Sequence, residues 1–270
     1  MMPGMKWIFA AALVAGFGSC SSLDDEAHLG DGRVRAVANT AYRSPSYAMP
    51  SRRNPDIHLP ANFGRSIEVT QSRGPSNYPY IAMTYDDGPH PRNTPRLLDM
   101  LRARNIKATF YVIGGSVDRY PQIVRRIVAE GHEIGNHTYT HRNLKTLSNP
   151  EVRRELARTR EAIIRAAGVQ PRTMRPPYGA LYQRQRLTIW QDFGYPTVLW
   201  AVDPKDWQRP GVEVVKHRIL SDTRNGSIVL SHDLHAPTVD AMPETLDGLL
   251  ERGFRFVTVS QLLALKAAQQ

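Results

Sequence analysis

From Tyr80 onward, short apolar runs rich in β-branched and aromatic residues alternate with longer amphipathic stretches. This alternation is typical of βα units, in which helices connect parallel strands and cover the resulting sheet or barrel. A segment as long as residues 80–270 buries roughly 70% of its unfolded surface on folding, which is enough for independent stability. We therefore expect an α/β fold with a parallel sheet or barrel, and a barrel of about seven units fits the pattern.

The expected elements follow the period of the apolar residues and the positions of Gly and Pro. Strands are predicted at residues 81–85, 108–113, 133–135, 173–175, 197–202, 227–231 and 256–259. Helices are predicted at residues 95–104, 121–129, 150–167, 181–193, 212–222 and 243–252. Four glycines are expected to end helices at their C-termini: Gly131, Gly168, Gly194 and Gly253.

The first twenty residues have the pattern of an export signal. Lys6 precedes an apolar run over residues 7–17, whose length suits a secretory signal and is too short to span a membrane. Gly18 and Ser19 then lead to Cys20, an arrangement that resembles a bacterial lipoprotein signal, in which cleavage leaves the cysteine to carry lipid. We expect a signal peptide over residues 1–19 and lipidation at Cys20. The alternative is a plain signal peptide with Cys20 incidental, and both predict export.

Residues 20–79 are expected to form a disordered or extended tether. Between residues 21 and 79, only nine of 59 residues are Leu, Ile, Val or Phe, too few to offset the entropy of folding. Residues 67–70 are the exception, because they could add a short strand at the edge of the domain. The catalytic domain is thus expected over residues 80–270.

Composition excludes several kinds of site. Cys20 is the only cysteine, so neither an intrachain disulfide nor a cysteine zinc cluster can form, and a metal would need His, Asp or Glu ligands. The net charge is +10, but the 35 Lys and Arg residues are scattered, with no run that could follow a phosphate backbone. We therefore expect no nucleic-acid partner.

Polar side chains follow the predicted strands, where βα barrels build their active sites. Asp86 and Asp87 end the first strand, and His137 and His141 follow the third. Two imidazoles four residues apart share one face of a helical turn and can bind one metal ion. With an upstream Asp they make a two-His, one-carboxylate set that leaves coordination positions open. Taken separately, the acidic pair could be a turn and the histidines could be surface residues.

Three more polar clusters follow later strands: Arg175-Pro-Pro-Tyr178-Gly, Asp203-Pro-Lys-Asp206-Trp207 and Leu230-Ser-His232-Asp. The consecutive prolines hold the backbone extended, so that Arg175 and the amide of Tyr178 are presented in a fixed direction. Each cluster alone could be ordinary loop chemistry. Five of them at five strand ends predict a common site.

The five motifs TYDDGP, HTYTH, RPPYG, DPKDW and LSH, in this order, resemble those of the polysaccharide deacetylases, the NodB-like or carbohydrate esterase family 4 enzymes. The resemblance spans about residues 80–263, and its one departure is Tyr85, where the family commonly has Phe. It implies a distorted (β/α) barrel and metal-dependent hydrolysis of acetyl groups on sugar polymers.

The resemblance also implies a role for each motif residue. Asp87, His137 and His141 match the metal ligands, Asp86 the catalytic base and His232 the catalytic acid. Arg175 and Asp206 match the residues that pair with this base and this acid. Tyr178 matches the donor of an oxyanion-binding amide, and Trp207 and Leu230 match a pocket for the acetyl methyl group.

These residues favour an N-deacetylase acting on a polysaccharide of the cell envelope that contains N-acetylglucosamine. Peptidoglycan comes first, because an anchored enzyme stays beside it, and chitin-type oligomers come next. One alternative is an O-acetyl esterase on xylan or another acetylated glycan, and another is a non-catalytic glycan-binding lipoprotein. The presence of Asp86 and His232 argues against a mere binder. We expect one divalent ion, zinc by default with cobalt or nickel as substitutes, and a monomer anchored on the periplasmic face of the envelope through Cys20.

Overall fold

The computed structural model describes residue 59, residue 63 and residues 68–267 of the 270-residue chain. The chain divides into two units, residues 1–50 and 51–270, and every described residue belongs to the second. Its strands are β1 (Thr70–Gln71), β2 (Tyr80–Asp86), β3 (Thr109–Val112), β4 (Glu133–Asn136), β5 (Thr197–Val198), β6 (Ile228–Val229) and β7 (Arg255–Phe256). Its α-helices are α1 (Asn93–Ala103), α2 (Gly114–Arg119), α3 (Pro121–Ala129), α4 (Asn149–Ala167), α5 (Gln183–Phe193), α6 (Val212–Asp222), α7 (Ala236–Glu251) and α8 (Val259–Ala267).

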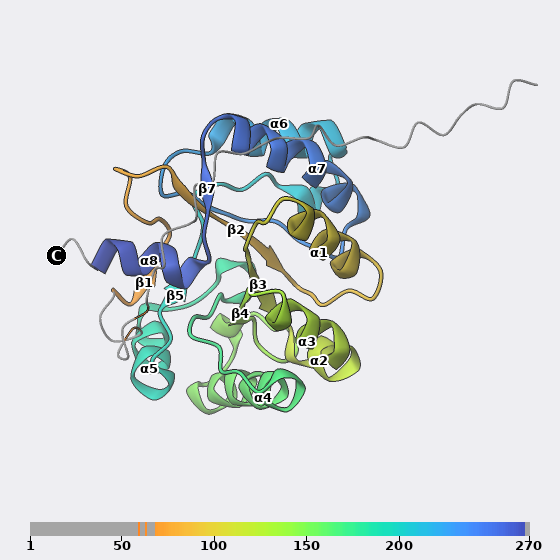
Figure 1. The fold of residues 1–270 in the computed structure, drawn as a ribbon. Coiled ribbons are helices and arrows are strands. Elements are labelled where there is room, and N and C mark those ends of the chain that lie inside the picture. The colour runs from red at the N-terminus through yellow and green to blue at the C-terminus, as the bar shows by residue number, and fades with distance from the viewer. Residues whose placement is uncertain (1–58, 60–62, 64–67, 268–270) are drawn as a thin grey trace, which may run out of the picture. The chain divides into compact units, whose positions relative to one another are not determined.

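The strands are parallel and the helices lie around them (Figure 1). One sheet has the order β4-β3-β2-β6, and β1 pairs with β5 in a second, two-stranded sheet. Single bridges continue the ring between the two sheets, from Asn136 to Met174, from Met174 to Thr197, and from Val202 to Val229. The expected distorted (β/α) barrel is therefore confirmed, with irregular pairing on the side opposite β2.

β2 is the central strand of the barrel, and all seven of its residues are buried. On one edge it pairs with β7 at its start and with β3 at its end, and on its other edge it pairs with β6. Alternate side chains point to opposite faces of a strand. Ile81, Met83 and Tyr85 accordingly pack in the core cluster that includes the helices, whereas Ala82 packs in a second cluster inside the barrel. The same alternation directs Asp86 inward.

The strands after β4 are shorter than predicted. Of residues 173–175, only Met174 makes ladder bridges, because Pro176 and Pro177 follow directly and have no N–H to donate. The stretch 197–202 reduces to β5 and a bridge at Val202, and 227–231 reduces to β6. Residues 256–259 were wrongly predicted as one strand, since β7 ends at Phe256 and Val259 begins α8.

Three helices differ from expectation. α2 and α8 were not predicted, because α2 begins with two glycines and α8 is short and mostly apolar. α7 begins at Ala236 and continues through Pro243, which was expected to start the helix. Pro237 occupies the first turn, where a missing N–H costs nothing. The four predicted glycine stops all have left-handed backbone conformations.

The described residues include part of the expected tether. β1 lies at the predicted edge position and pairs with β5, and Leu59 and Phe63 pack against the inner core cluster. The expected signal, Cys20 and most of the tether lie outside the described residues. Among the residues described, no helix has the length and apolar character needed to cross a bilayer.

Candidate active site

The carboxyl ends of the parallel strands bring the five polar clusters to one end of the barrel. Asp86, the last residue of β2, bridges to His232 beyond β6, and Asn136 at the end of β4 bridges to Met174, next to Arg175. Because adjacent parallel strands run in the same direction, residues beyond their ends become neighbours. The clusters thus share one site, as expected from their positions in the sequence.

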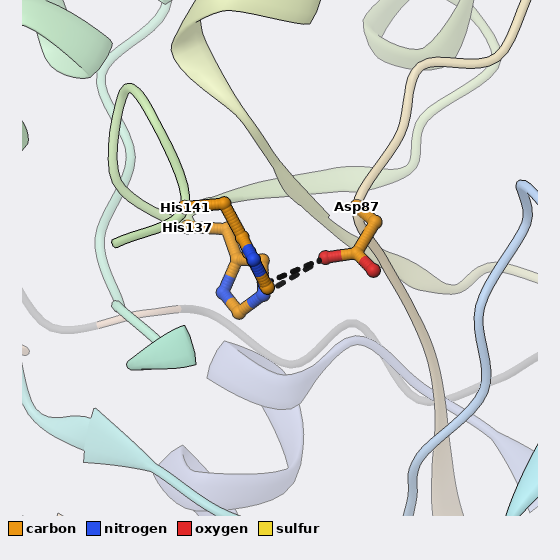
Figure 2. A group of neighbouring side chains, drawn as sticks. All are labelled: Asp87, His137 and His141. Carbon is orange, nitrogen blue, oxygen red and sulfur yellow. Dashed lines mark ion pairs between the residues drawn. The ribbon is translucent and has the colours of Figure 1, made fainter. Parts of the chain in front are cut away.

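Asp87, His137 and His141 converge on one point (Figure 2). Asp87 Oδ1 lies 3.3 Å from His137 Nε2 and 3.0 Å from His141 Nε2. The spacing of the two histidines predicted a helical turn. They lie instead on an irregular loop after β4. Thr138 and His141 have φ angles of 65° and 58°, and these left-handed residues curl the loop so that both rings face Asp87.

The donor set of these three residues fits a divalent metal ion. The Nδ1 atom of His137 donates to the carbonyl of Arg175 at 2.7 Å, so that its Nε2 lone pair faces Asp87. Asp87 Oδ1 is buried and has no hydrogen bond of good geometry despite the two nearby imidazoles. An unsatisfied buried carboxylate oxygen beside two imidazole nitrogens is what a cation would complete.

Protons and a metal ion compete for these side chains. Burial alone would raise the pKa of Asp87, but the neighbouring His137 and His141 hold it well below its usual range. Burial lowers the pKa of His137, yet the charges of Asp86 and Asp87 outweigh it and raise the pKa. Asp87 is therefore ionised at neutral pH and available as a ligand.

Asp86 forms a buried pair with Arg175. The Arg175 guanidinium is fully buried and donates from one nitrogen to Asp86 Oδ1 at 2.8 Å and to Thr84 Oγ1 at 2.6 Å. It also donates to the carbonyls of Val198 and Leu199, so that bonds from several sides fix its plane. Asp86 Oδ2 lies 3.8 Å from His137 Nε2, which places the carboxylate beside the possible metal site.

His232 forms the second pair, with Asp206. Its Nδ1 atom lies 2.8 Å from Asp206 Oδ1, and its backbone N–H donates to Asp206 Oδ2. Burial lowers the pKa of His232, but the hydrogen bond and charge of Asp206, with the charges of Asp86 and Asp87, raise it to about 9. The imidazole is therefore protonated at neutral pH and carries its second N–H on Nε2.

The remaining predicted residues surround this centre. Tyr178 has a φ of 61°, is 70% exposed, and its ring lies edge-on to His141 with 4.9 Å between ring centroids. Trp207 directly follows Asp206 in a 3-10 helix (Asp206–Gln208) and is 52% exposed. Leu230 is buried just after β6.

Several side chains that support the site were not assigned by sequence reasoning. Thr84 lies within the first motif and shares Arg175 with Asp86, and Thr238 donates to Asp206 Oδ2 at 2.9 Å. Asp233 is buried beside Gly88, where a Cβ atom would meet its carboxyl group. Glu155 on α4 accepts hydrogen bonds from the histidine loop. Thr84 belongs to the first motif and Asp233 to the last polar cluster, a signal that could have identified them, whereas Thr238 and Glu155 lie in helices.

Comparison with known proteins finds one family. The model of the polysaccharide deacetylase family matches residues 73–198. The peptidoglycan-N-acetylglucosamine deacetylase PgdA of Listeria monocytogenes is 37% identical over 201 residues, covering 74% of this chain and 42% of that protein. The chain thus spans less than half the length of this relative.

Two solved structures extend the comparison. The peptidoglycan N-acetylglucosamine deacetylase Bc1960 is 34% identical with a TM-score of 0.70, over 76% of this chain and 97% of the other. BA3943 from Bacillus anthracis, described as a pseudoenzyme of carbohydrate esterase family 4, is 32% identical with a TM-score of 0.68, over 72% of this chain and 68% of the other.

Proposed function

This chain belongs to the polysaccharide deacetylase family, and from that premise we propose that it is a metal-dependent hydrolase of N-acetyl groups. Its substrate is an envelope polysaccharide that contains N-acetylglucosamine, with peptidoglycan favoured. One observation carries the proposal: an Asp-His-His trio, a buried Asp–Arg pair and a buried His–Asp pair meet at one end of the barrel. Amide hydrolysis needs a polarised carbonyl, a base and an acid, and these three groups can supply them.

Asp87, His137 and His141 would hold the metal ion, and zinc is proposed because it suits two imidazoles and a carboxylate. When bound, such an ion polarises the acetyl carbonyl and lowers the pKa of water. With three protein ligands, coordination positions are left for water and substrate.

Asp86 is proposed as the general base. Its Oδ1 is held by Arg175, so that the carboxylate is oriented, and its Oδ2 is left to accept the proton of the attacking water. Complete burial of Arg175 excludes solvent from this pair and strengthens the interaction.

His232 is proposed as the general acid. Asp206 engages Nδ1, so the proton on Nε2 is the one that can pass to the leaving nitrogen of the sugar. An amine is a poor leaving group without that proton, which is why an amide hydrolase requires an acid.

The oxyanion and the acetyl methyl group need separate contacts. We propose that the backbone amide of Tyr178 donates to the developing oxyanion, a contact that its left-handed conformation and the preceding prolines orient. Trp207 and Leu230 are proposed to form the apolar pocket for the methyl group.

The pseudoenzyme BA3943 indicates that this fold alone does not guarantee catalysis. The argument for activity in this chain is the presence of both proton-transfer pairs, since a protein that only binds glycan needs neither. The alternative substrate is an O-acetyl ester of a glycan, because one such site can cleave both amides and esters.

Acetate release from peptidoglycan, chitin oligomers and acetylated xylan, compared side by side, tests the proposal. We expect release from peptidoglycan to exceed the other two, and Asp86→Asn protein serves as the inactive control. Release from xylan alone would make the protein an O-acetyl esterase. No release from any substrate by metal-loaded protein would favour a binding function.

We further propose that the protein is exported and anchored to the envelope by lipid at Cys20. The apolar run and the small residues before this cysteine support the proposal. An anchor of this kind would keep the catalytic barrel next to its polymer.

A further inference from the structure

The loop that carries the metal-binding histidines has a disfavoured backbone. Thr138 and His141 adopt left-handed conformations, which are uncommon for residues other than Gly and are least favourable for a β-branched residue such as Thr138. Such conformations persist only where surrounding contacts determine them. The rings of His137 and His141 could not both face Asp87 without these two turns, so the contacts that fix the loop also fix the metal site.

The main side-chain contact comes from Glu155, a buried residue in the middle of α4. Its Oε2 atom accepts the backbone N–H groups of Tyr139 and Thr140, both at 2.8 Å. Its Oε1 atom accepts the hydroxyl of Thr140, also at 2.8 Å. One carboxylate thus binds three donors on the residues between the two histidines.

Other contacts hold the opposite side of the loop. The N–H groups of Gly114 and Gly115, at the start of α2, donate to the carbonyls of Thr138 and Tyr139 at 2.9 and 3.1 Å. The Tyr139 ring is covered by the Arg158 guanidinium, 3.6 Å from its centroid. The carbonyls are therefore satisfied from α2, and the N–H groups of Tyr139 and Thr140 by Glu155.

We propose that Glu155 is a positioning residue that preorganises His137 and His141 for metal binding. The hydrogen bonds of its carboxylate go to the residues between the two histidines, and it acts by holding the amides of Tyr139 and Thr140, which keeps the loop in its left-handed turns. Without it, metal binding must first order the loop, and affinity falls by the cost of that ordering. This inference rests on the proposed metal dependence.

The test measures zinc affinity by calorimetry on metal-free proteins, below their unfolding temperatures. The variants Glu155→Ala, Glu155→Gln and Glu161→Ala are each compared with wild type. Glu155→Ala is expected to weaken the Kd about 10- to 100-fold, the range typical for partners that orient metal ligands. Glu155→Gln should stay within a few-fold of wild type, because its Oε1 can still accept both amides. Glu161 is an exposed glutamate of the same helix, and its replacement should leave the Kd unchanged.

Kinetics give a second measurement. With saturating zinc, Glu155→Ala should recover most of the wild-type kcat, since the reacting groups are intact, while the zinc concentration for half-maximal activity rises. A general structural role would lower the melting temperature without this shift. Wild-type zinc affinity in folded Glu155→Ala protein would overturn the inference.

If Glu155→Ala does not fold, Glu155→Asp decides instead. Its carboxylate keeps the charge but is one methylene too short to reach all three donors, so it should bind zinc more weakly than Glu155→Gln does. Equal or tighter binding by Glu155→Asp would overturn the inference. The outcomes remain separable from the proposed function, because wild-type protein that binds zinc but releases no acetate refutes the activity and leaves the loop argument intact.

Discussion

At the scale of single residues, we expect His232 and Asp206 to set the alkaline limit of activity. The raised pKa of His232, about 9, keeps its proton available at neutral pH, and activity should fall as the pH rises through this value. Asp206→Asn removes the charge that raises the pKa, so the alkaline limb of kcat/KM should move down by roughly 1–2 pH units. Asp203→Asn, four residues from Trp207 on the same loop, is the control and should leave the limb in place. If the alkaline limb of kcat/KM in Asp206→Asn lies at the same pH as in wild type, a group other than His232 causes it.

Substitution of Asp86 tests proton transfer separately from metal binding. Asp86→Asn should keep the metal ion, because Asp87, His137 and His141 are unchanged, yet lose roughly 10²- to 10⁴-fold in kcat as expected for removal of a positioned base. Elemental analysis of the dialysed protein measures the bound metal, and acetate release measures the activity. Asp87→Ala is the contrasting variant, which should lose the metal ion and the activity together. Full activity of the Asp86→Asn variant would show that Asp86 is not the general base.

His232→Ala tests the assignment of the acid. Its deficit should be smaller on an activated aryl acetate, whose leaving group hardly needs a proton, than on an N-acetyl sugar. Rates on both substrates at one pH provide the comparison. Equal deficits would exclude His232 as the proton donor, and the role would pass to His235 or to water.

The site residues could be predicted because each lies in a short polar motif directly after a strand. Parallel strands bring such motifs together whatever their distance along the chain, so Asp86 and His232 were expected to meet. Glu155 could not be found in this way. It lies in a run of charged residues on α4, where an acidic side chain reads as solvated, and only the three-dimensional packing turns it toward the histidine loop.

At the scale of elements, His132 links the chain before β4 to the chain before β3. Its Nδ1 accepts the N–H of Ala108, and its buried Nε2 has no hydrogen-bond partner. Burial, with the charges of Lys107 and Arg126, lowers its pKa from 6.5 to about 4. Below pH 6.5 the unfolded chain therefore takes up a proton that the folded chain does not. His132 should thus remove stability as the pH falls from about 6.5 to about 4, by about 3 kcal/mol in total.

His132→Asn keeps an acceptor for Ala108 but does not titrate in this range. The free energy of unfolding of this variant, measured by urea at several pH values, should depend less on pH between 4 and 6.5 than that of wild type. His217→Asn, at an exposed position of α6, is the control. Parallel curves for wild type and His132→Asn would contradict the assignment.

Element boundaries followed from the sequence where periodicity was strong and failed where it was weak. The helices at 121–129 and 212–222 were predicted to the residue, because their apolar spacing and flanking signals agree. α2 was missed since its opening glycines favour a turn. Tertiary contacts determine it instead, because a Cβ atom at Gly114 would lie 2.5 Å from the Tyr139 ring. The two-residue strands β5 and β6 depend on barrel closure, which no local pattern encodes.

At the scale of the whole molecule, Cys20 is the proposed point of attachment. Cys20→Ser should release the protein from membranes into the soluble fraction, because the lipid-bearing thiol is gone. Fractionation followed by immunoblotting measures the distribution, and Ser21→Ala, which keeps the cysteine, is the control. Membrane association of Cys20→Ser equal to wild type would contradict lipid anchoring.

The pairing of β2 with strands from the end of the sequence has a consequence for the order in which the chain folds. Thr84 donates to the carbonyl of Val229, 145 residues away, and β7 pairs with the start of the same strand from still farther along. A ribosome therefore completes the buried strand β2 long before β6, which covers its second edge. Contacts so distant in sequence form slowly, and an uncovered strand edge with unpaired N–H and C=O groups invites pairing with other chains. Nascent chains truncated before β6 should consequently need chaperones to stay monomeric, and Asp86 can meet His232 only when most of the last quarter of the protein has been made.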